Sequence, residues 1–260
     1  MKRFEDKVVI VTGAGSGIGA GTARRFLQEG AFVAVNGRRE AKLYETIEGI
    51  DAAQSLVHPG DVSDETYVKR LVEDTVTKFG KLDVLVNNAG MAIFGPFEQT
   101  TTAVWRKTMG TDLDGVFFGA REALPHLLKT KGSIVNLSSA SGLGGDWGMS
   151  AYNAAKGAVT NFTRALALEY GSRGVRVNAV APSFTSTEAT FDLEKNEAVQ
   201  AAFRDRLPIG RAATPDEIAG VIAFLASEDA RFVNGVILPV DGGLGASNGQ
   251  PNFLSLFGQG

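Results

Sequence analysis

Short apolar runs rich in β-branched residues alternate with longer segments of helical spacing along most of the chain. Residues 7–12 (KVVIVT) form the first such run, and residues 17–29 follow with the periodicity of an amphipathic helix. The apolar runs are nearly continuous rather than interleaved with polar residues, which is typical of strands buried on both faces of a sheet. This alternation predicts an α/β fold in which one doubly wound parallel sheet, of about seven strands, carries helices on both faces.

No linker or internal repeat interrupts the pattern, so we expect residues 1–260 to form a single domain. Residues 183–207 are long and polar where a strand-to-helix loop should be short. Inserted segments at the carboxyl edge of such a sheet usually cover a ligand, so we predict a substrate lid there. Residues 242–260 form a C-terminal tail rich in Gly, Asn and Gln.

The composition excludes several classes of function. Lys and Arg number 26 against 29 Asp and Glu, so no basic field is available to hold nucleic acid. The absence of Cys excludes a disulfide scaffold and thiolate chemistry. No apolar run approaches the roughly 20 residues of a membrane helix, and the charged first residues do not read as a signal peptide. We expect a cytoplasmic protein that binds neither nucleic acid, nor membrane, nor a catalytic metal.

A glycine-rich turn at residues 12–19 (TGAGSGIG) separates the first predicted strand from the first helix. Glycine lets the backbone turn tightly and approach a pyrophosphate, while the helix N-terminus offers N–H donors and a favourable dipole. A plain strand-to-helix turn is the alternative, but the position after the first strand of a parallel sheet favours a Rossmann-like dinucleotide site. The predicted phosphate-binding residues are Gly13, Ser16, Gly17, Ile18 and Gly19.

The end of the second predicted strand bears on the choice between NAD and NADP. An acidic residue there would bind the ribose 2′-hydroxyl, but the segment reads Asn36-Gly37-Arg38-Arg39. Guanidinium forks match a phosphate dianion, so we predict NADP(H), with NAD(H) as the alternative. Arg38 is the stronger candidate, since Arg39 could simply begin a solvated helix. After the third strand, Asp61 and Val62 would lie near the adenine, although Asp61 could equally be a turn residue.

Tyr152 and Lys156 stand four residues apart at the start of a predicted helix. This spacing puts both side chains on one helix face. A nearby ammonium favours the phenolate, so the pair allows a tyrosine to act as acid or base near neutral pH. Such a pair is often merely structural, but here it follows the fifth strand, which ends in Ser138 and Ser139. The predicted catalytic residues are Ser139, Tyr152 and Lys156.

Taken together, these motifs resemble the short-chain dehydrogenase/reductase family over essentially the whole chain. The matching pieces are Thr12-Gly13-x-x-x-Gly17-x-Gly19, Asn87-Asn88-Ala89-Gly90, Ser139, Tyr152-x-x-x-Lys156, Arg176-Val177-Asn178, Pro182…Thr187 and Asp241-Gly242-Gly243. The resemblance implies an oxidoreductase that moves a hydride between the nicotinamide and a substrate carbon. It also implies a homotetramer, built through the helical segments at 101–129 and 151–170 and through the last strand.

The resemblance also implies a role for each matching residue. Tyr152 would exchange the proton with the substrate oxygen, Ser139 would position that oxygen, and Lys156 would lower the pKa of Tyr152 and hold the nicotinamide ribose. The remaining cofactor contacts would come from Asn88, Ala89, Gly90, Pro182, Ser183, Thr185 and Thr187.

Two positions depart from the family pattern. Asp112 stands where the family usually has an Asn whose backbone carbonyl holds a relay water. Asp keeps that carbonyl and loses the amide donor, so we add Asp112 to the predicted catalytic residues and expect it to retain the structural role, with its carboxyl protonated or differently paired. Ser183 replaces a Gly after Pro182, which we expect to alter the loop only slightly.

Several further stretches are similar to the members of the family that act on acetoin, diacetyl and 2,3-butanediol. A small apolar pocket beside Tyr152 is predicted from Ser139, Ser141, Leu143, Trp147, Met149 and Phe184. For Trp147, simple loop packing is the alternative. The candidates for the moving part of the lid are Phe184, Thr187, Glu188 and Phe191.

Two other functions stay open at this point. Reduction of 3-oxoacyl thioesters or of sugar and uronate ketones would use basic residues at the pocket mouth, for which Arg204, Arg206 and Arg211 are available. A non-catalytic dinucleotide-sensing module is the alternative from another class, and the intact Ser139, Tyr152 and Lys156 argue against it.

Overall fold

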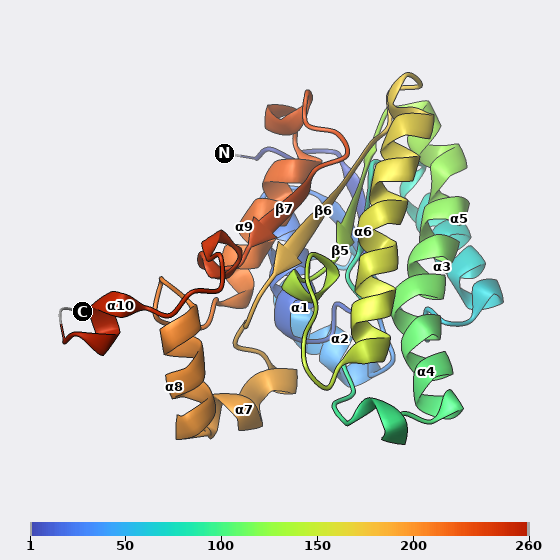
Figure 1. Cartoon of the computed structure of the whole chain (residues 1–260). Coiled ribbons are helices and arrows are strands. Elements are labelled where there is room, and N and C mark those ends of the chain that lie inside the picture. Colours follow the sequence, from blue (N-terminus) through green and yellow to red (C-terminus); the bar gives the residue numbers. More distant parts are fainter. Residues whose placement is uncertain (1, 259–260) are drawn as a thin grey trace.

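The computed structural model describes residues 2–258 and confirms the predicted fold class (Figure 1). Seven strands form one sheet in the order β3-β2-β1-β4-β5-β6-β7. Every neighbouring pair is parallel. The strands are β1 Val8–Val11, β2 Phe32–Gly37, β3 Ser55–Pro59, β4 Val84–Asn87, β5 Ser133–Leu137, β6 Arg176–Pro182 and β7 Ile237–Val240.

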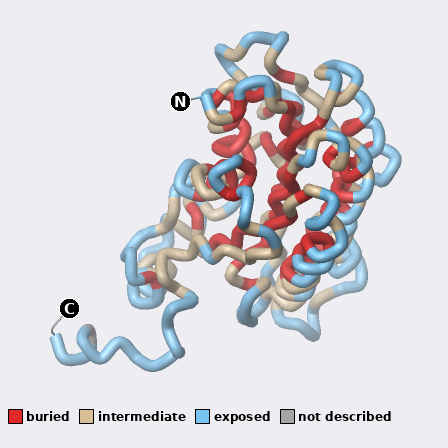
Figure 2. Tube along the Cα trace, turned by 90° about the horizontal axis from the view of Figure 1, so that it is seen from above, coloured by how far each residue is buried: buried red, intermediate tan, exposed pale blue. Residues whose placement is uncertain are grey.

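Helices cover both faces of the sheet, and each face has its own apolar core (Figures 1 and 2). Val9 and Val11 of β1 pack with α1 and α9, whereas Val8 and Ile10 pack with α3, α5 and α6. This follows from the alternation of side chains along a strand. The helices are α1 Gly17–Gln28, α2 Glu40–Thr46, α3 Glu65–Phe79, α4 Thr102–Met109, α5 Gly115–Thr130, α6 Ser150–Gly171, α7 Phe191–Lys195, α8 Glu197–Arg206, α9 Pro215–Ala226 and α10 Phe253–Leu256.

Local capping residues explain several helix boundaries. The Asp64 carboxylate accepts the N–H groups of Thr66 and Tyr67 at 2.9 and 3.2 Å, so α3 begins there. α9 begins with a capping box between Thr214 and Glu217. The single helix suggested by residues 101–129 is wrong in detail, because residues 110–114 form a π-helical turn between α4 and α5. In that turn the Gly115 N–H bonds to the Gly110 carbonyl, five residues back.

The segment between β6 and α9 carries α7 and α8, which lie beside the sheet rather than on it (Figure 1). The tail then leads away from β7 to α10, whose apolar residues Phe253, Leu254 and Leu256 are exposed (Figure 2). The last two residues of the predicted tail, 259 and 260, lie outside the described part of the chain. Among the helices the structure describes, none is long and apolar enough to cross a membrane.

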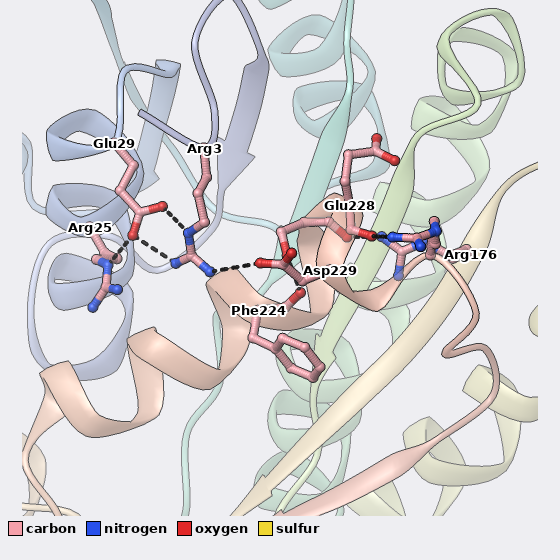
Figure 3. A network of polar contacts seen from close by, with 9 residues as sticks. Arg3, Arg25, Glu29, Arg176, Phe224, Glu228 and Asp229 are labelled. Atoms are coloured by element: carbon pink, nitrogen blue, oxygen red, sulfur yellow. Dashed lines mark hydrogen bonds and ion pairs between the residues drawn. The ribbon is translucent and has the colours of Figure 1, made fainter. Parts of the chain in front are cut away.

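An ion-pair network ties elements together near the amino edge of the sheet (Figure 3). Arg3 donates to both carboxylate oxygens of Glu29 at 2.6 and 2.7 Å and lies 3.9 Å from Asp229. Arg25 of α1 also donates to Glu29. Burial opposes the charge on Glu29, yet the two guanidinium groups hold the pKa of this carboxyl below its ordinary value.

Candidate functional site

A cavity of about 570 Å³ lies at the carboxyl ends of β1, β2 and β4. The strand order reverses between β1 and β4, since β2 and β3 follow on one side of β1 and β5 to β7 on the far side of β4, and such sheets form a ligand crevice at this point. Most of the predicted cofactor residues line this cavity: Gly13, Ser16, Gly17, Ile18, Gly19, Arg38, Arg39, Asp61, Val62, Asn88, Ala89, Gly90 and Thr187. The other predicted cofactor residues lie outside its lining, namely Tyr152, Lys156, Pro182, Ser183 and Thr185.

The glycine-rich turn forms a cradle that side chains would fill. Gly13 has a φ of +67°, and a Cβ there would lie 2.8 Å from the Ala89 Cα. The side chain of Ser16, the N-cap of α1, makes no capping hydrogen bond, so the first N–H groups of the helix are left for a ligand. Asn88 donates its amide to the carbonyl of Thr12, and its Oδ1 is buried with no hydrogen-bond partner in residues 2–258. The cradle therefore fits a dinucleotide pyrophosphate.

The two arginines after β2 differ in their surroundings. Within the described chain, the exposed Arg38 guanidinium has neither a hydrogen-bond nor an ion-pair partner. Arg39 donates to both oxygens of Glu188 at 2.8 and 2.6 Å. Asp61 lines the same cavity and also shapes its turn, accepting the Ser63 N–H and hydroxyl at 3.0 and 2.9 Å.

Tyr152 and Lys156 lie on one face of the first turns of α6. The Lys156 Nζ is 5.5 Å from the centre of the Tyr152 ring, and the lysine is only 2% exposed. Its ammonium donates to the Leu137 carbonyl at 2.9 Å and lies 3.2 Å from the Asp112 Oδ1. Burial opposes the charge on Lys156, but Asp112 and Tyr152 together hold the pKa of the lysine above its ordinary value.

Asp112 reaches Lys156 from the π-helical turn. Its carboxylate accepts the Met91 N–H at 3.2 and 3.1 Å, and the residue is fully buried. Burial raises the pKa of this carboxyl above its ordinary value, against the opposing pull of Lys156. A Cβ at Gly90 would lie 2.7 Å from the Asp112 Oδ1, so only glycine leaves room for this pair. From the sequence we expect altered pairing of this carboxyl, but the sequence does not identify Lys156 as its partner, because periodicity does not reveal a π-helical turn.

Ser138 and Ser139 have separate roles at the end of β5. The Ser138 hydroxyl forms hydrogen bonds with the Thr160 hydroxyl at 2.6 Å and with the Lys156 carbonyl at 3.3 Å. Ser139 Oγ accepts only the N–H of Ser141, at 3.1 Å, within the described residues. Gly142 lets this loop pack on α6, since a Cβ there would lie 2.7 Å from the Lys156 carbonyl. Ser139 is therefore the serine whose hydroxyl proton stays available.

Two of the residues predicted for the substrate pocket line an open cavity of about 1150 Å³, whose lining does not include Tyr152. Leu143 and Trp147 line it, but Trp147 is 89% exposed because its loop of glycines leaves it without cover. Ser139, Ser141, Met149 and Phe184 are not in its lining. The Ser141 hydroxyl bonds to Asp146. The Phe184 ring stacks on Phe203, a lining residue of α8 that no sequence signal singled out, with ring centroids 4.1 Å apart.

The two histidines lie apart from this constellation. His58 bonds to the Tyr67 hydroxyl at 2.7 Å and to Asp74 at 3.0 Å, on the α3 side of the sheet. No group of three or more His, Asp or Glu side chains suited to a metal occurs among the residues the structure describes.

Comparison with known proteins gives consistent results. A family model described as enoyl-(acyl carrier protein) reductase matches residues 13–245. The meso-2,3-butanediol dehydrogenase of Serratia marcescens is 47% identical, over 97% of this chain and 100% of that protein. An NADP-dependent (R)-specific alcohol dehydrogenase of Lentilactobacillus kefiri is 40% identical, over 93% and 97% of the two chains. The crystal structure of levodione reductase superposes with a TM-score of 0.87 at 35% identity, covering 94% of this chain and 100% of that one.

Proposed function

The chain belongs to the short-chain dehydrogenase/reductase family of NAD(P)-dependent oxidoreductases, and we propose that it reduces small ketones with NADPH and oxidises the matching secondary alcohols with NADP⁺. The proposed substrates are acetoin, diacetyl and 2,3-butanediol, on the strength of the 47% identical butanediol dehydrogenase. The observation that carries the proposal is the buried Lys156 beside Tyr152, adjoining a cavity shaped for a dinucleotide.

Tyr152 is the proposed general acid and base. The cavity lined by the glycine-rich turn and Arg38 would hold NADP(H), which when bound would supply hydride-transfer chemistry at the carbonyl or carbinol carbon. As negative charge develops on the substrate oxygen, the Tyr152 hydroxyl donates its proton, and the Lys156 ammonium stabilises the phenolate that results. Ser139 donates a second hydrogen bond to the same oxygen and orients it. Asp112 keeps Lys156 charged and in place.

The proposed NADP preference rests on the end of β2. Gly37 offers no carboxylate to a ribose 2′-hydroxyl, while Arg38, which has no partner in residues 2–258, lines the cavity. A guanidinium fork binds a phosphate dianion through charge-assisted hydrogen bonds. The 40% identical NADP-dependent alcohol dehydrogenase also supports this choice.

Reduction of a 3-oxoacyl thioester or a sugar acid is less well supported. That activity would need free cations at the pocket mouth for the carrier or carboxylate. Arg211 is occupied by Glu217, with contacts of 2.8 and 2.7 Å, and Arg204 donates to Gln200 at 3.1 Å. Of the three arginines only Arg206 lines the large cavity. A non-catalytic module that senses the dinucleotide is also less well supported, because it gives the Tyr152–Lys156 pair no function.

We extend the proposal to a homotetramer. Trp105 of α4, Phe117 of α5 and Leu168 of α6 are 40%, 42% and 85% exposed in the single chain. β7 is an edge strand, and none of its four residues is fully buried. Exposed apolar side chains and an open strand edge are surfaces that subunits cover. A monomeric mass by light scattering at micromolar concentration would contradict the assembly.

A substrate panel tests the proposed activity. Acetoin, diacetyl, a 3-oxoacyl thioester and a keto-sugar acid are each assayed with NADPH and with NADH. We expect the highest kcat/KM for the small ketones with NADPH. A preference for the thioester or the sugar acid would replace the substrate assignment, and a large preference for NADH would contradict the role of Arg38.

A further inference from the structure

An ion pair beside the dinucleotide cavity joins Arg39, which lines that cavity, to Glu188, which lies outside its lining. Arg39 is the N-cap of α2, and Glu188 begins the short helical turn at Glu188–Thr190 in the predicted lid. Both nitrogens of the guanidinium fork contact the carboxylate, at 2.8 and 2.6 Å, and one of them also lies 3.4 Å from the Ser16 hydroxyl. Arg39 and Ser16 line the cavity from one side, and Thr187 and Ala189 from the other. We name this Arg39–Glu188 pair the clasp.

Arg38 and Arg39 are the two guanidinium groups that could bind the 2′-phosphate of NADP(H). In the clasp, the Arg39 guanidinium is already bound to Glu188. The hydrogen bonds from Arg39 hold the pKa of Glu188 below its ordinary value, so the carboxylate is charged at neutral pH. In the described part of the chain the Arg38 guanidinium has no partner, whereas two nitrogens of the Arg39 guanidinium contact the Glu188 carboxylate. Both clasp side chains are 54% exposed, and ion pairs of this exposure contribute little stability and exchange partners readily.

We propose that Glu188 is a cofactor-specificity residue, which competes with the 2′-phosphate of NADP(H) for Arg39. This inference rests on the proposed function, because it concerns the same dinucleotide cavity. NADP(H) must displace Glu188 to use the second guanidinium, whereas NAD(H) has no 2′-phosphate and leaves the clasp closed. Glu188 thus acts through Arg39. It weakens the binding of NADP(H) but not of NAD(H), so the preference for NADP(H) is smaller than it would be without Glu188.

The lid turn does not depend on Glu188 for its shape. Thr190 donates its hydroxyl to the Thr185 carbonyl at 2.6 Å and accepts the Thr187 N–H at 2.9 Å. These bonds remain when the Glu188 carboxylate is replaced by an amide of the same size. A Glu188→Gln variant therefore removes the competing charge and leaves the fold of the lid intact.

Equilibrium binding of the nucleotides tests the clasp. The Kd values of NADPH and NADH are measured by nucleotide fluorescence for the wild type and for Glu188→Gln. We expect the Kd of NADPH to fall about threefold and that of NADH to stay unchanged, the size set by the modest strength of an exposed ion pair. Glu197→Gln is the matched control, because it removes an exposed carboxylate at the start of α8, also in the lid, without contact to Arg39.

The remaining outcomes separate the clasp from the proposed function. An unchanged Kd for NADPH, an equal change for both nucleotides, or the same gain in Glu197→Gln would each overturn the clasp while leaving the oxidoreductase assignment standing. A wild type that binds neither nucleotide would overturn the proposed function and the clasp with it.

Discussion

The two edges of the same sheet treat their charged groups differently. Near the amino edge, Glu29 is held by Arg3 and Arg25, and the buried Asp83 accepts the Val8 N–H at 2.9 Å and lies 3.5 Å from Lys7. At the carboxyl edge, Arg38 is unpaired among the described residues and the Asn88 Oδ1 has no partner there. The strand order reverses between β1 and β4, and this leaves a crevice at the carboxyl edge that Arg38 and Asn88 line. The charged groups named at the amino edge are paired within the fold, whereas the carboxyl edge combines the Arg39–Glu188 and Lys156–Asp112 pairs with polar groups that have no partner among the described residues.

The largest effect should come from Tyr152 at the carboxyl edge. Tyr152→Phe removes the proton donor but keeps the ring against Lys156, so we expect kcat for ketone reduction to fall about 10³-fold with the Kd of NADPH nearly unchanged. Steady-state kinetics and nucleotide fluorescence measure the two quantities. The matched control is Tyr170→Phe at the far end of α6, which should keep full activity. A Tyr152→Phe enzyme with more than a tenth of the wild-type kcat would contradict the assignment of Tyr152 as the general acid.

The second-largest effect should be on cofactor binding, when the Arg38 guanidinium is removed. Arg38→Gln removes the free guanidinium, so we expect the Kd of NADPH to rise about tenfold, in line with the loss of a charge-assisted hydrogen bond, and the Kd of NADH to change little. Titration with both nucleotides checks this. Equal weakening of both would mean that Arg38 supports the turn rather than the phosphate.

Asp112 should alter the pH dependence more than the rate. Asp112→Asn keeps an acceptor for the Met91 N–H but removes the anion that partly offsets Lys156. Without that anion, burial lowers the pKa of Lys156, so the pH above which Lys156 loses its charge and alcohol oxidation declines should move about one unit lower. Asp114→Asn, two positions along and exposed, is the control. A pH–rate profile identical to that of the wild type would remove any special role for the carboxylate.

The smallest effect belongs to the amino edge and should appear only in stability. Glu29→Gln weakens the contacts with Arg3 and Arg25, and we expect a loss of about 1 kcal/mol near neutral pH with kcat and cofactor Kd unchanged. Because the folded pKa of Glu29 lies below its ordinary value of 4.5, this contribution is present above pH 4.5 and disappears as the pH falls through the folded pKa. Denaturant unfolding of the wild type and of Glu29→Gln across this pH range measures the difference in their free energies of unfolding. A difference in the free energy of unfolding that persists in acid, or a loss of activity in Glu29→Gln, would contradict the purely stabilising role of this amino-edge carboxylate.

Much of the fold could be predicted because its signals are local. The predicted strand at 7–12 contains β1 (Val8–Val11), and the predicted helix at 17–29 agrees with α1 (Gly17–Gln28) to within one residue, since buried strands and amphipathic helices are encoded by their own composition. The glycine-rich turn was located for the same reason. The Asp112–Lys156 pair was not predicted, because it depends on a π-helical turn that hydrophobic periodicity cannot separate from an α-helix. The clasp joins residues 149 positions apart and follows only from the folded arrangement.

The most direct test of the central claim is the fate of the hydride. Acetoin is reduced by the wild-type enzyme with NADPH that is dideuterated at C4 of its nicotinamide, and the product is analysed by mass spectrometry. Hydride transfer at the carboxyl edge predicts 2,3-butanediol carrying a single deuterium on the new carbinol carbon, and no labelled product from Tyr152→Phe on the same timescale. Unlabelled butanediol, or labelled product formed equally fast by Tyr152→Phe, would contradict it.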